Sequence, residues 1–191
     1  MSRVVRNALL FGLTPLLAGS DLLVKALTIA LFGLLLMSLG GVTLMPLRRW
    51  LQGKALALAA LLLSALLIGC GDLLLQLFSG ELHAALAAWL PLLALPMLAL
   101  AFDERPTITS GLHAGLAFAA LALSLGLLRE GFGNGSLFAH MDWLFGQAAS
   151  SWQLSLHGGI GLLAYAPGAL ILIGLLLAAR RLFFNSTSEP S

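Results

Sequence analysis

The chain has 191 residues, of which 60% are hydrophobic and only 9% are charged, and its formal net charge is +2. An ordinary soluble domain is about one quarter charged, so this chain has too little polar surface to cover a water-soluble domain. It contains several apolar runs of about 18 or more residues, which are typical of membrane spans. Composition therefore indicates an integral membrane protein in contact with lipid, and the small net charge gives no sign of nucleic-acid binding.

Six candidate spans follow one another along the chain and predict an all-α membrane fold. They cover roughly residues 7–20, 22–45, 55–78, 84–102, 111–128 and 160–181. The longest segment between spans, 131–159, fits either a helix lying in the membrane interface or a folded loop that caps the bundle. Residues 1–184 are thus predicted to form one membrane domain, and 185–191 a disordered cytoplasmic tail.

The distribution of basic residues predicts the orientation. If the N-terminus is inside, eight of the ten Lys and Arg residues fall on the cytoplasmic side, and only Lys25 and Arg129 fall outside. The positive-inside rule favours that arrangement. We therefore expect a multi-pass membrane protein with both termini in the cytoplasm.

Prolines are expected to break the first and fourth spans, and the tetrapeptide Pro-Leu-Leu-Ala occurs in both, at 15–18 and 91–94. The candidate positions are Pro15, Pro91 and Pro96. Three spans per half would make the halves, about 7–80 and 84–181, inverted three-helix repeats whose broken helices meet near the midplane. The alternative is that proline is simply common in membrane helices and that a four-residue match arises by chance in a chain rich in Leu and Ala.

Three polar residues are candidates for an ion path. Asp21 and Lys25 are four apart and can pair on one helix face, either within the membrane or at its outer interface. Asp72 lies in an apolar run with Gln76 one turn further on, so its carboxyl group is expected to be protonated, paired or in contact with water. The alternative is that the third span ends before Asp72.

Small residues in the second, third and fifth spans are predicted to let helices pack closely, notably Gly111 and Gly115. The sequence contains no nucleotide loop, catalytic triad or paired-carboxylate motif, and its four histidines lack metal-ligand spacing. We therefore predict no catalytic residue and no metal site in this chain, which would be a non-catalytic or accessory subunit if it serves an enzyme.

Four stretches together resemble the E subunit of the Rnf (Rsx) ion-translocating electron-transport complex. They are GLTPLLA at 12–18, LRRW at 47–50, LREGFGNGSLF at 128–138 and PGA at 167–169. The chain is similar, more distantly, to the D subunit of the sodium-pumping NADH:quinone reductase. The resemblance covers nearly the whole chain, and the Arg-Glu-x-x-Gly-Asn-Gly stretch is its most specific part.

The resemblance implies a subunit that pairs with a sister six-span subunit of opposite orientation, beside other Rnf-type subunits. The complex would couple electron transfer between ferredoxin and NAD to Na⁺ or H⁺ transport, with flavins on other subunits. It also implies an iron–sulfur cluster held by two cysteines from each sister.

Here the two family cysteine positions fall on Thr14 and Met97, which are poor substitutes for thiolates, and Cys70 lies where the family has no ligand. We therefore expect this chain alone to bind no cofactor. The alternative function is a stand-alone small membrane transporter, or an assembly or scaffold protein, that has lost electron-transfer chemistry.

Overall fold

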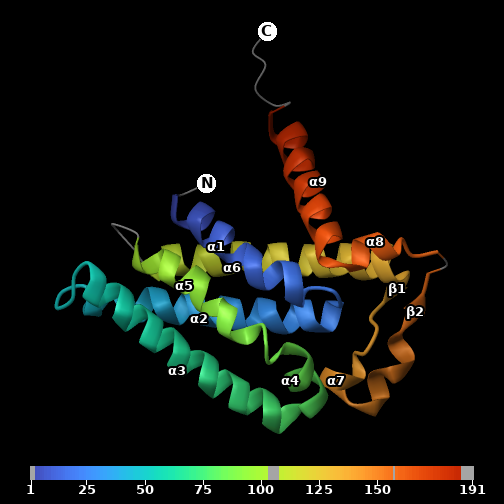
Figure 1. Cartoon of the computed structure of the whole chain (residues 1–191), viewed down its shortest axis with the longest axis horizontal. Coiled ribbons are helices and arrows are strands. Elements are labelled where there is room, and N and C mark those ends of the chain that lie inside the picture. Colours follow the sequence, from blue (N-terminus) through green and yellow to red (C-terminus); the bar gives the residue numbers. More distant parts are fainter. Residues whose placement is uncertain (1–2, 103–107, 157, 186–191) are drawn as a thin grey trace.

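The computed structural model describes residues 3–102, 108–156 and 158–185, and most of them are helical (Figure 1). The long helices are α1 (Arg3–Gly19), α2 (Leu23–Leu47), α3 (Lys54–Phe78), α6 (Ile108–Leu128) and α9 (Ala166–Asn185). The short helices are α4 (Gly80–Leu86), α5 (Ala94–Ala101), α7 (Asp142–Phe145) and α8 (Gly161–Ala164). Two 3₁₀ turns, Leu90–Leu93 and Gln147–Trp152, one π-helical turn, Arg129–Asn134, and the strands β1 (Ser136–Leu137) and β2 (Leu154–Ser155) complete the described residues.

Helices α2 and α6 form the centre of the fold and lie side by side along most of their length (Figure 1). Their backbones approach closely because α6 carries glycine at the contact. A Cβ atom on Gly111 would lie 2.7 Å from the Met37 carbonyl oxygen, and one on Gly115 would lie 3.2 Å from the Leu34 Cα. The predicted packing role of these two glycines is therefore confirmed, since any larger residue would push the helices apart.

The fourth predicted span is interrupted, as expected. Helix α4 and the segment Leu90–Ala101 are bent by 66° about the break between them. Pro91 lies in the 3₁₀ turn after the break, and Pro96 lies in the first turn of α5, where a missing N–H costs no intrahelical bond. The bend therefore lies before Pro91, and Pro96 does not break its helix.

The break expected at Pro15 is wrong. Helix α1 runs without interruption from Arg3 to Gly19 with this proline inside it. The chain leaves the helix only at Ser20, and α2 begins at Leu23. A proline inside a helix removes one backbone hydrogen bond and can kink the helix without ending it.

Three helical segments are long and apolar enough to cross a membrane, namely Leu23–Leu47, Lys54–Phe78 and Thr109–Asn134. Counting the bent pair as one span gives up to four among the described residues. The first and last predicted spans correspond to the shorter apolar helices Val5–Leu17 and Ala166–Ala178. The fold is thus a helical membrane fold with three to four candidate spans, while six spans in two inverted repeats stay a prediction.

The segment 131–159 is a folded loop and not one continuous interfacial helix. It contains the short helix α7, a 3₁₀ turn, and the antiparallel strand pair in which Ser136 faces Ser155. Helix α9 then rises away from the α2–α6 pair (Figure 1). The predicted tail lies outside the described residues from 186 onward, as does His157.

Candidate functional site

The most distinctive polar feature is a pair of charged residues buried where α6 ends. Arg129 is 2% exposed and Glu130 is fully buried, although both side chains are ordinarily charged. They begin the π-helical turn Arg129–Asn134. Such turns are rare in proteins, and those that do occur are often found at functional sites. We refer to Arg129, Glu130 and the helix ends that they contact as the polar joint.

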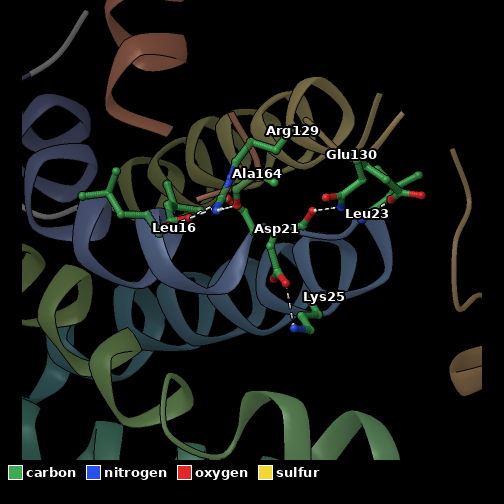
Figure 2. Close-up of polar contacts among 10 residues, drawn as sticks. Leu16, Asp21, Leu23, Lys25, Arg129, Glu130 and Ala164 are labelled. Atoms are coloured by element: carbon green, nitrogen blue, oxygen red, sulfur yellow. Dashed lines mark hydrogen bonds and ion pairs between the residues drawn. The ribbon is translucent and has the colours of Figure 1, made fainter. Parts of the chain in front are cut away.

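Arg129 binds the ends of two other helices (Figure 2). Its Nη1 donates to the carbonyl oxygen of Leu17, in the last turn of α1, at 3.0 Å and to the Ser20 hydroxyl at 3.2 Å. Its Nη2 donates to the carbonyl oxygen of Ala164, the last residue of α8, at 2.7 Å. The last four carbonyls of a helix have no intrahelical donor, so the guanidinium satisfies groups that would otherwise be orphaned.

Glu130 binds the N-terminal end of a helix, whereas Arg129 binds C-terminal ends. Its Oε2 accepts a hydrogen bond from the backbone N–H of Leu23, the first residue of α2, and its Oε1 accepts one from the N–H of Ala139 at 2.6 Å. A carboxylate at a helix N-terminus and a cation at a helix C-terminus both interact favourably with the helix dipole. Two adjacent side chains therefore fix the positions of α1, α2 and α8 around the end of α6.

Glycines allow the backbone of the segment 131–159 to pack closely around the polar joint. Gly135 has a left-handed φ of 64°, and a Cβ there would lie 2.7 Å from the Leu156 carbonyl oxygen. A Cβ on Gly133 would lie 2.7 Å from the Ala164 backbone nitrogen. The glycine-rich GFGNGS stretch is thus explained by backbone approach, which brings α8 within reach of Arg129.

The predicted pairing of Asp21 with Lys25 is confirmed. Lys25 Nζ lies 2.9 Å from Asp21 Oδ2, and this ion pair borders the polar joint (Figure 2). Asn134 Nδ2 donates to the Asp21 backbone carbonyl at 3.3 Å. The second carboxylate oxygen of Asp21 is buried without a hydrogen-bond partner among the described residues. A role of the pair in an ion path stays a prediction.

Asp72 lies in α3, one of the candidate membrane spans, and is paired. Helix α3 continues to Phe78, so the helix itself does not end before Asp72, while the depth of this residue in the membrane stays a prediction. Asp72 Oδ1 lies 2.8 Å from His83 Nδ1, and Gln76 Nε2 donates to Asp72 Oδ2 at 3.3 Å. The chain turns sharply at Ser79, whose Oγ caps α4 by accepting from the Leu82 N–H, and this turn brings His83 back to α3.

The residues at the two family cysteine positions do not fit an iron–sulfur cluster. Thr14 is exposed on α1, and its hydroxyl is a hard, weakly acidic donor. Met97 is fully buried and packs against Gly40 of α2, where a Cβ atom would lie 3.5 Å from the Met97 sulfur. Cys70, the only cysteine of the chain, is a free thiol exposed on α3. This chain therefore brings no thiolate to either position, and a cluster needs several.

Sequence reasoning missed the chemistry of three residues here. The sequence shows Arg129 and Glu130 only as part of a motif, and His83 only as a histidine without metal-ligand spacing. The available signal was the presence of a charged Arg-Glu pair directly after an apolar run that lacks a polar face.

The fold and these sites together define a helical integral membrane protein whose few buried charges bind helix ends and one another. The family described as Rnf-Nqr subunit, membrane protein, matches residues 3–177. The chain belongs to this family.

Individual relatives lead to the same family. The chain is 32% identical over 183 residues to the E subunit of an ion-translocating oxidoreductase complex from Cellvibrio japonicus, covering 90% of this chain and 77% of the relative. It is 33% identical to the protein of the same name from Thioalkalivibrio sulfidiphilus, covering 91% and 81%. It is 34% identical to that from Pseudomonas paraeruginosa, covering 94% and 80%.

Proposed function

We propose that this chain is the E-type membrane subunit of an Rnf-type complex that couples electron transfer between ferredoxin and NAD to Na⁺ or H⁺ transport. The observation that carries the proposal is the family match over residues 3–177, together with relatives that are named as the E subunit of an ion-translocating oxidoreductase complex. In this proposal the chain lies in the bacterial inner membrane beside a sister six-span subunit of opposite orientation. Its own six spans form two inverted repeats with both termini in the cytoplasm.

The contribution of this chain is structural and ionic, not redox. In this proposal flavins and other electron carriers reside on partner subunits, and this chain holds no cluster of its own, because Thr14 and Met97 do not provide thiolate ligands. Among the described residues, no group of three or more His, Cys, Asp or Glu side chains could hold a metal ion. The polar joint supports the structural part of the role, since it fixes four helical elements against one another.

Asp72 with His83 is the proposed ion-handling site. The two side chains are partly buried, with exposures of 31% for Asp72 and 25% for His83, and they come from two elements, α3 and the first part of the broken fourth span. Ionisable residues inside membrane segments commonly mark ion or proton pathways. A carboxylate next to an imidazole can hold one proton between them, and a carboxylate oxygen is a hard ligand that suits a cation such as Na⁺. Asp21 and Lys25 are further candidates for residues of the ion path.

The test of this proposal uses the whole complex in proteoliposomes, with electron transfer and ion uptake measured in the same preparation. Asp72→Asn should reduce coupled ion uptake to the level of an ionophore-treated control while electron transfer from ferredoxin to NAD continues. His83→Gln should give a partial loss. Glu81→Gln is the matched control, because this exposed carboxylate lies two residues from His83 on α4 and should leave uptake unchanged.

Unchanged ion uptake in Asp72→Asn would refute the ion-handling role and leave complex membership intact. Membership is tested separately by purifying a tagged chain from native membranes. Co-purification with flavin-bearing partners supports the complex, whereas a chain that purifies alone as a homodimer supports the stand-alone alternative. Labelling both termini from each side of the membrane tests the predicted sidedness.

A further inference from the structure

A long groove runs between α1, α6 and α9, away from the features described above. Its volume is about 1100 Å³. Clefts that bind drug-sized ligands commonly have volumes of roughly 300–1,000 Å³, so the groove is large enough for a lipid headgroup with one acyl chain. Most of its wall is apolar and comes from all three helices, including Leu9, Leu13, Ala117, Leu121 and Ile173.

One end of the groove is polar and basic. Arg6, near the start of α1, and His113, near the start of α6, both line it and are both exposed. His113 Nδ1 lies 2.6 Å from the Thr109 carbonyl oxygen, so Nδ1 donates in that contact, and Nε2 can donate to an anion only when the ring is in its protonated form. None of the described residues that line the groove is acidic.

The polar end also lies at the N-terminal ends of two helices. Helices α1 and α6 pack against each other and run in the same direction (Figure 1). The positive ends of both helix dipoles therefore add to the charge of Arg6. The remainder of the groove extends along the same helices and offers only aliphatic side chains and Ser124. The groove thus has a basic end and an apolar body, which is the complement of an acidic amphiphile.

We infer that this groove binds an anionic phospholipid, with its phosphate at Arg6 and His113 and an acyl chain along Leu9, Leu13 and Ala117. The positive charge of Arg6, with no acidic side chain among the described lining residues, favours an acidic lipid over a zwitterionic one. A basic pocket between membrane helices on the cytoplasmic side is also where anionic headgroups are bound. The site is independent of the proposed ion-handling pair, because α3 and α4 do not line the groove.

The experiment reconstitutes the intact complex in vesicles that contain a small fraction of phosphatidylglycerol or phosphatidylcholine with a photoreactive group in the acyl chain. After irradiation, lipid adducts are mapped by peptide mass spectrometry. Adducts on residues 5–13 and 113–124 report on the groove, and adducts on α3, which exposes Leu62 and Leu66, serve as the internal reference for bulk lipid. The expected result is a higher groove-to-α3 ratio for phosphatidylglycerol than for phosphatidylcholine.

Variants identify the headgroup contact. Arg6→Gln should lower the phosphatidylglycerol ratio roughly five-fold, which is the effect of one basic residue near an anionic membrane surface. Arg49→Gln is the matched control, because this exposed arginine does not line the groove. Equal labelling by the two lipids, or no response to Arg6→Gln, would overturn the inference. So would a groove without adducts in which Ala120→Cys cross-links to a partner subunit, since the occupant would then be protein.

Discussion

Replacing Arg129 by methionine should destabilise the protein more than any other single change at a charged residue. The substitution keeps a long, flexible side chain of similar reach but removes the donors to Leu17, Ser20 and Ala164. Two carbonyl oxygens at helix ends then lose their partner in a part of the fold that water does not reach easily. The expected consequence is weaker attachment of both α1 and α8 to the end of α6.

The size of the effect can be bracketed from these contacts. Side-chain hydrogen bonds between membrane helices average about 0.6 kcal/mol each, which gives about 2 kcal/mol for three. Breaking a buried charged network by removing one partner costs about 3–5 kcal/mol, and this sets the upper end. Methionine avoids the cost of burying a charge, so the net loss of unfolding free energy should lie at about 2–4 kcal/mol.

The measurement is unfolding in mixed micelles, with increasing mole fraction of sodium dodecyl sulfate and helix content read by circular dichroism. Arg129→Lys keeps the charge, but one ammonium group lacks the fork that reaches two helix ends, so it should recover no more than about half of the loss. Arg49→Met is the matched control at an exposed arginine. If Arg129→Met and Arg49→Met change the unfolding free energy equally, the polar joint does not hold the helix ends together and the reasoning fails.

Three further outcomes follow from the same contacts. Glu130→Gln should lower the unfolding free energy by about 1–3 kcal/mol, because the glutamine NH₂ would face one of the two backbone N–H groups that now donate to the carboxylate. Hydrogen exchange should become faster at the Leu23 and Ala139 amides. Gly133→Ala should lower the unfolding free energy by about 1–3 kcal/mol, since the new Cβ would clash with the α8 backbone. Gly69→Ala, which adds its Cβ in open space, should be neutral or stabilising, and thermal unfolding in detergent compares the two variants. Lys25→Met should cost less than about 1 kcal/mol by the same micelle titration, as expected of a partly exposed pair four residues apart, and a larger loss would mean that Asp21 depends on this lysine.

Local patterns in the sequence determined much of the fold. The predicted spans 22–45, 55–78 and 111–128 correspond closely to α2, α3 and α6, because a run of apolar residues long enough for a bilayer is a property of consecutive positions. The Asp21–Lys25 pair followed from helical spacing in the same way. The expected interruption of the fourth span was also present, whereas the one at Pro15 was not, because a proline can lie within a helix without ending it.

Only the tertiary structure decided what the buried charges contact. Arg129 reaches carbonyl oxygens 112 residues before it and 35 residues after it, and every residue type offers the same carbonyl group. A sequence therefore shows that an arginine follows an apolar run, but it does not show which carbonyl groups the arginine binds. His83 meets Asp72 only because the chain reverses at Ser79, and a shift of that turn by one residue would rotate the imidazole away. The membrane fold could thus be predicted from composition and periodicity, while the sites required the three-dimensional arrangement of helix ends.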